Sequence, residues 1–231
     1  MALGGAEPVA TIAEAVLRLG QREVFRLAAL ALMHRWEGAT WRNTYGTEPG
    51  DYCRHALCTA IAASTLAELG CGPDPQVAYT AGLVCDLGKL ALAQSAERFF
   101  PVIYAHRARD GGTWVEAECA VLGYSYLQVT AQLLRLWKFP EMLAVAAEHW
   151  QRPQDAPSAG RVLPALLHAA KHVAAALGPG VGDDGFLFEL QSECLLEQGL
   201  TPELLEATLP IVIEQASSVL HEKLTFGALV F

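Results

Sequence analysis

The chain has 231 residues, of which 52% are hydrophobic and 18% are charged. This length and balance exclude a disordered protein and are sufficient for one domain with a buried core. The net charge of −9 excludes a general nucleic-acid or anionic-membrane surface, because such partners need clustered Lys and Arg side chains.

Targeting and redox signals point to the cytoplasm. Residues 1–20 lack the basic segment followed by an apolar one that marks a signal peptide. No apolar run reaches the roughly 18–20 residues of a membrane-spanning helix. The six cysteines show no C-x-x-C pair and no zinc-ribbon spacing, so we expect free thiols in a cytoplasmic protein without a membrane partner.

The N-terminal part is predicted to be helical after a tail at residues 1–10. Apolar residues recur at helical spacing over 12–19, where Gly20 is a suitable C-cap, and again over about 24–36. A loop rich in Gly, Thr and Asn is predicted at 41–50.

Four helices are predicted in the middle of the chain. A long Ala-rich helix is predicted over 51–69, where small residues allow close helix packing. Asp74-Pro75 begins a helix that is expected to run to about residue 93. A capping box at Thr113 and Glu116 begins another. An apolar stripe then predicts a helix that ends at Phe139-Pro140; its residues are Leu127, Ala131, Leu134 and Trp137.

The remaining segments are also helical in pattern. A short helix is predicted over 141–150 and an internal loop over 151–160, which holds two prolines and one glycine. The next helix, marked by Val162, Leu166, Ala169 and Val173, is followed by Gly178-Pro179-Gly180. Thr201-Pro202 begins the last one, which Pro210 is expected to bend. An apolar tail covers 224–231. The sequence therefore predicts a single all-α domain over 1–231, a multi-helix bundle without a significant sheet.

Four side chains are candidates for a shared polar site: His55, Asp86, Lys89 and His149. Asp86 lies in an apolar segment, and a buried carboxylate needs a partner, which is a metal ion, His55 or Lys89. Each residue also has a plain structural interpretation. His55 can bond a nearby carbonyl, Asp86 can cap a helix, Lys89 can reach solvent, and His149 can sit in a last helical turn.

The joint pattern resembles the HDOD family, the HD-related output domain branch of the HD phosphohydrolase superfamily. The most specific match is Ala81-Gly82-Leu83-Val84-Cys85-Asp86-Leu87-Gly88-Lys89, which is similar to the family's "aGLLHDIGk" segment. Five further segments follow the family's order: 12–20, 54–56, 116–140, 148–150 and 199–205. The resemblance implies an HD-like helical bundle, with His55, Cys85, Asp86, Lys89 and His149 around a remnant cleft.

The departures from a catalytic HD domain concern its metal ligands. The resemblance implies a His-Asp pair, but Cys85 stands in place of its His, and Lys171 or His172 in place of the last Asp. An ammonium repels a divalent cation and offers no lone pair, and a thiolate is a poor ligand for Mg²⁺ or Mn²⁺. The loop 151–160 also lacks the Gly-Tyr-Pro motif of the cyclic-dinucleotide phosphodiesterases.

The resemblance therefore implies a non-catalytic bacterial signal-transduction domain without a cofactor, which binds a separate signalling protein. Five aromatic residues are candidates for that surface, although burial is the default for each: Trp36, Trp41, Tyr45, Trp114 and Trp150. One alternative is a residual phosphohydrolase with Fe, Mn or Zn on His55, Asp86 and His149. The other is a nucleotide-binding sensor in which Lys89 and His149 hold a phosphate without turnover.

Overall fold

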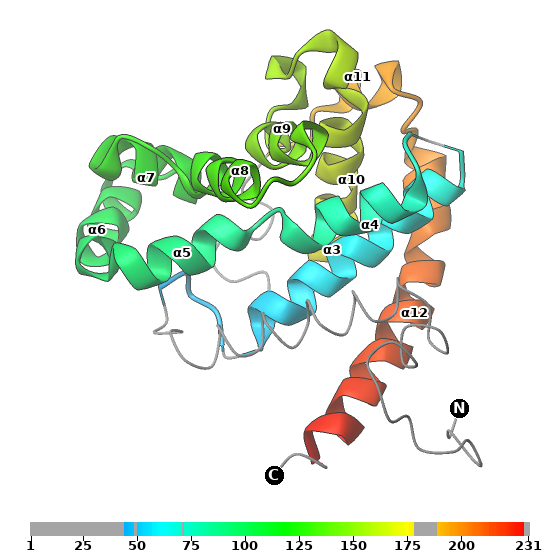
Figure 1. Cartoon of the computed structure of the whole chain (residues 1–231), viewed down its shortest axis with the longest axis horizontal. Coiled ribbons are helices and arrows are strands. Elements are labelled where there is room, and N and C mark those ends of the chain that lie inside the picture. The colour runs from blue at the N-terminus through cyan, green and yellow to red at the C-terminus, as the bar shows by residue number, and fades with distance from the viewer. Residues whose placement is uncertain (1–43, 49, 71, 178–188, 229–231) are drawn as a thin grey trace.

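A computed structural model describes residues 44–48, 50–70, 72–177 and 189–228 of the chain, and these residues form helices and loops without a strand (Figure 1). In chain order the elements are α3 (Asp51–Glu68), α4 (Pro75–Val84), α5 (Leu87–Ser95), η1 (Glu97–Phe99), α6 (Phe100–Asp110), α7 (Trp114–Leu122), α8 (Tyr126–Leu136), α9 (Glu141–His149), η2 (Pro153–Asp155), η3 (Ser158–Gly160), α10 (Val162–Ala176), α11 (Ser192–Glu197) and α12 (Pro202–Ala228). The all-α prediction is confirmed. The helices predicted over 12–19 and about 24–36 lie outside the described residues.

Helices α4 and α7 begin at the N-terminal caps that the sequence predicted. The Asp74 carboxylate accepts a hydrogen bond of 2.6 Å from Gln76 N, and Pro75 occupies the first helical position of α4. Thr113 and Glu116 form the predicted capping box of α7. These starts depend on residues within one turn, which is why the sequence alone predicts them.

The core is built around α3, which packs against α4, α10 and α12. Small residues allow the close approach of α3 and α4, since a Cβ on Gly82 would lie 2.6 Å from Ala60 Cα. The apolar stripe of α12 contributes buried Val212 and Ala216 to this core. In Figure 1, α3 and α4 run side by side through the middle of the molecule, with α12 crossing at one end.

The helix expected over residues 75–93 is interrupted, and this is the main correction to the predicted elements. Cys85 and Asp86 lie in a turn between α4 and α5. After the turn, α5 packs against α8, where Gly88 N donates a 2.8 Å hydrogen bond to Thr130 Oγ1. The break therefore places Asp86 at a junction rather than in the middle of a helix.

Other differences concern segments with weak local signals. The predicted loop over 151–160 contains the two 3₁₀ turns η2 and η3, and the helices α6 and α11 have no counterpart among the predictions. Helix α12 continues through Pro210 and includes residues 224–228 of the expected apolar tail. Among the described residues, no helix combines the length and apolar character needed to cross a membrane.

Candidate functional site

The site centres on the ammonium of Lys171, which the sequence had placed only as a departure from a metal ligand. Lys171 extends from α10 to the α4–α5 junction, where its Nζ forms an ion pair with Asp86 Oδ2. The same Nζ lies 2.9 Å from His55 Nε2 on α3. Lys171, Asp86 and His55 are 3%, 4% and 8% exposed, so the three polar groups meet inside the protein.

The positive charges near Asp86 stabilise its ionised carboxylate. Burial alone would raise the pKa of Asp86, but the ammonium groups of Lys171 and Lys89 hold it well below its usual range. The indole of Trp150 covers the cluster, with Lys171 Nζ 4.8 Å from the ring centroid. Asp86 is therefore ionised, and its charge is balanced within the protein.

Lys89 is half-buried and lies against a second polar cluster, which sequence analysis did not identify. Its Nζ lies 4.7 Å from the ring centroid of Tyr126 and 5.4 Å from that of Tyr45. The carboxylate of Glu118, fully buried on α7, accepts hydrogen bonds from Tyr45 Oη (2.7 Å) and Tyr126 N (2.6 Å). The position of Glu118 among the apolar residues of α7 is the sequence feature from which this cluster could have been predicted.

The possibility that aromatic residues form a partner surface is wrong for the three that the structure describes. Tyr45, Trp114 and Trp150 are all buried, and Tyr45 and Trp114 pack edge to face with ring centroids 4.8 Å apart. These rings stabilise the core and offer no surface to a partner. Trp36 and Trp41 lie outside the described residues.

Cys85 is next to the central cluster, but its thiol is directed elsewhere. Cys85 Sγ donates to Gly82 O at 3.2 Å, and the side chain is 1% exposed. Burial, together with the neighbouring charge of Asp86, raises the pKa of the Cys85 thiol to about 12. The fold therefore favours the protonated thiol at neutral pH, which is a weak nucleophile.

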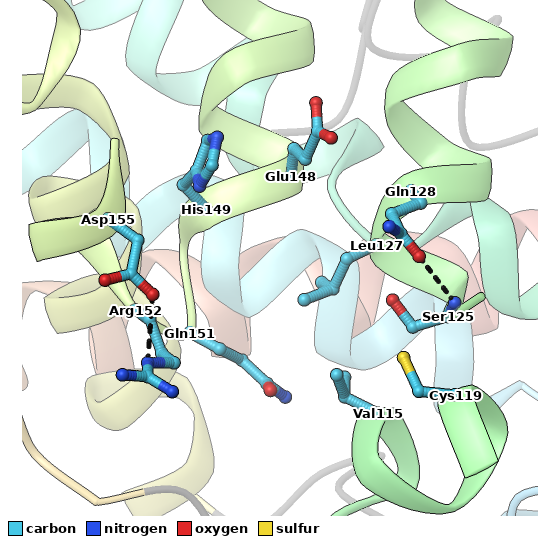
Figure 2. Close-up of a pocket in the computed structure, with 10 residues that line it drawn as sticks. All are labelled: Val115, Cys119, Ser125, Leu127, Gln128, Glu148, His149, Gln151, Arg152 and Asp155. Atoms are coloured by element: carbon cyan, nitrogen blue, oxygen red, sulfur yellow. Dashed lines mark hydrogen bonds and ion pairs between the residues drawn. The ribbon is translucent and has the colours of Figure 1, made fainter. Parts of the chain in front are cut away.

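His149 lines a separate open pocket of about 250 Å³ (Figure 2). Figure 2 shows Arg152 and Asp155 on one side of this pocket and Cys119 and Ser125 on the other. Arg152 and Asp155 form an ion pair of 3.0 Å. His55, Asp86 and Lys171 are not among the residues that line the pocket. The structure thus brings His55 and Asp86 together, but it places His149 in different surroundings.

His168 is a buried polar residue that sequence analysis did not select. Gln191 N donates to His168 Nε2 at 3.1 Å, so the ring proton lies on Nδ1 and is donated to Trp150 O at 2.8 Å. Burial lowers the pKa of His168 to about 4. His172, the other residue considered at the last Asp position, packs against His168 with ring centroids 5.2 Å apart, which leaves Lys171 as the residue that reaches Asp86.

The donor set does not fit a divalent metal ion. A structural or catalytic metal needs at least three lone-pair donors around one point. In the described part of the chain, no group of three or more His, Cys, Asp and Glu side chains is placed to hold one. At the position between Asp86 and His55 the protein supplies an ammonium, which carries its own positive charge and no lone pair.

Comparison with solved structures identifies similar folds in three bacterial proteins. A candidate signal transduction protein from Marinobacter aquaeolei VT8 is 25% identical, with a TM-score of 0.72 over 93% of this chain. A candidate phosphohydrolase from Shewanella amazonensis SB2B is 24% identical (TM-score 0.64; 89% of this chain and 73% of that one). An HDOD domain protein of unknown function from Geobacter sulfurreducens is 18% identical (TM-score 0.65; 95% and 74%).

The chain spans only 47% of the Marinobacter protein. A comparison with curated proteins finds no significant match. The HDOD domain matches residues 2–153, which is more than half of the chain. This match, together with the all-α fold shared with the Geobacter protein, shows that the chain belongs to the HDOD family.

Proposed function

We propose that this chain is a regulatory domain of signal transduction that acts by binding a signalling protein and does not catalyse metal-dependent hydrolysis. The observation that carries the proposal is the Lys171 ammonium between Asp86 and His55. A hydrolase of this chemistry activates water on a metal ion, and here a fixed positive charge repels such an ion. The similarity to the Marinobacter signal transduction protein supports the regulatory part of the proposal.

The proposed partner is a separate protein rather than a nucleic acid. The net charge of −9 disfavours association with a polyanion. A nucleotide-binding sensor would need Lys89 and His149 at one phosphate. Lys89 instead lies over the rings of Tyr45 and Tyr126, and it is not among the residues that line the pocket of His149.

A phosphodiesterase assay tests the proposal. The purified chain would be incubated with bis(p-nitrophenyl) phosphate and with nucleotides, in the presence of Mg²⁺, Mn²⁺, Fe²⁺ or Zn²⁺ in turn. The control is Asp86→Asn, which keeps the shape of the side chain and removes its charge. We expect no turnover above that of Asp86→Asn with any metal. Metal-dependent hydrolysis that disappears in Asp86→Asn would overturn the proposal.

A further inference from the structure

Three segments that are distant in sequence meet at one buried nitrogen. Lys171 is 116 residues from His55 and 85 residues from Asp86, and its Nζ contacts both side chains. The contacts join α10, α3 and the α4–α5 junction. A metal ion in this position would hold the same segments together and would balance the same carboxylate.

The Lys171 ammonium can both hold the three segments together and balance the charge of the Asp86 carboxylate. It has three N–H donors and a permanent attachment to α10. The ammonium donates to Asp86 Oδ2 and lies 2.9 Å from His55 Nε2, which accepts a hydrogen bond when the ring proton is on Nδ1. The face of Trp150 lies 4.8 Å away and favours a cation at the same point.

The second carboxylate oxygen of Asp86 also bears on whether a metal ion could bind here. Asp86 Oδ1 is buried and accepts no hydrogen bond from the described residues. One carboxylate oxygen and one imidazole nitrogen therefore already converge on the site of the ammonium, and Oδ1 is adjacent. A single further carboxylate at position 171 would bring the number of protein ligands to three, the minimum of a zinc or manganese site.

We infer that Lys171 is a tethered cation that has taken over the structural role of a divalent metal ion between His55 and Asp86. The site is then one substitution away from binding a metal. The role of Lys171 does not depend on which partner the domain binds, and it explains why an ionised carboxylate is stable in the interior.

The direct test replaces the ammonium with a carboxylate. Lys171→Asp would be refolded and titrated with Mn²⁺ and Zn²⁺ by calorimetry, and thermal unfolding would be followed with and without EDTA. We expect binding of about one equivalent, a rise in Tm with metal and its reversal by EDTA. Lys138→Asp is the matched control, because Lys138 is exposed in the connection that follows α8, and we expect no metal-dependent shift in it or in the unaltered protein. A folded Lys171→Asp protein without metal binding would contradict the inference.

A double-mutant cycle keeps the test decisive if Lys171→Asp does not fold. Lys171→Met leaves Asp86 without its balancing charge and should lower Tm by about 10 °C, the scale for breaking a buried pair in a protein of this size. The double variant Lys171→Met/Asp86→Asn should lose less than the sum of the two single losses. Additive losses would overturn the tethered-cation role and would leave the proposed regulatory function intact. Metal-dependent hydrolysis by the unaltered protein would overturn both.

Discussion

Lys171 and Asp86 form an ion pair in the interior, where burying either charge without the other would be strongly unfavourable. The sequence indicates that Asp86 needs a partner, and it suggests a metal ion, His55 or Lys89. The ion-pair partner is Lys171, and His55 binds the same ammonium. Helical periodicity relates residues three or four positions apart, so it contains no information on a pair separated by 85 residues.

A prediction at this scale concerns the pH dependence of stability through His168. Its pKa is about 4 in the folded protein and 6.5 in the unfolded chain, so the unfolded chain binds the additional proton between these values. The stability that this residue contributes is complete above pH 6.5 and is lost as pH falls toward 4. The full loss is on the order of 3 kcal/mol.

Urea unfolding of the protein and of His168→Gln between pH 4 and 7.5 measures this effect. The free energy of unfolding of the unaltered protein minus that of His168→Gln should become smaller as pH falls from 6.5 toward 4. His172, whose pKa burial also lowers, would leave a residual slope of the same sign in the variant. A difference that stays constant from pH 7 to pH 4 would show that His168 is not held neutral by the fold.

At the scale of elements, the break between α4 and α5 determines where Asp86 and Lys89 lie. After the break, α5 approaches α8 so closely that a Cβ on Gly88 would lie 2.0 Å from Tyr126 O. That carbonyl belongs to the backbone and cannot move away without displacing α8. The glycine is therefore required by the packing of the two helices.

Gly88→Ala is expected to destabilise the protein by at least about 2 kcal/mol, because a side chain there forces α5 and α8 apart. Gly160→Ala is a suitable control, since its Cβ would have only an ordinary contact of 3.9 Å with Val145. The two free energies of unfolding would be compared by chemical denaturation. Equal stability of the two variants would mean that α5 and α8 are less closely packed than the structure shows.

The sequence predicted elements well where the signal lies within one turn. Asp74 and the Thr113–Glu116 capping box begin helices as expected, because their hydrogen bonds are local. The turn at residues 85–86 was not predicted, because Ala81 to Lys89 has a continuous helical pattern and the break depends on contacts with α8 and α10. The buried Glu118 was missed for the same reason, since its acceptors are filled by Tyr45 and Tyr126.

For the molecule as a whole, the helices enclose the ion pair of Lys171 with Asp86 and the buried carboxylate of Glu118. Lys171 joins α10 to α3 and the α4–α5 junction, and Lys89 lies over the rings of Tyr45 and Tyr126, where the Tyr45 hydroxyl donates to Glu118. Both lysines lower the pKa of Asp86. Of the residues that carry the resemblance to HD hydrolases, His55 and Asp86 meet Lys171 in the interior, whereas His149 lines a separate pocket.

Elemental analysis of the purified, unchelated protein tests the central claim most directly, with Asp86→Asn measured in parallel. The Lys171 ammonium should keep Fe, Mn and Zn far below one equivalent per chain in both proteins. Near-stoichiometric metal in the unaltered protein that is lost in Asp86→Asn would show that Asp86 holds a metal ion after all, and it would contradict the tethered cation and the non-catalytic role together.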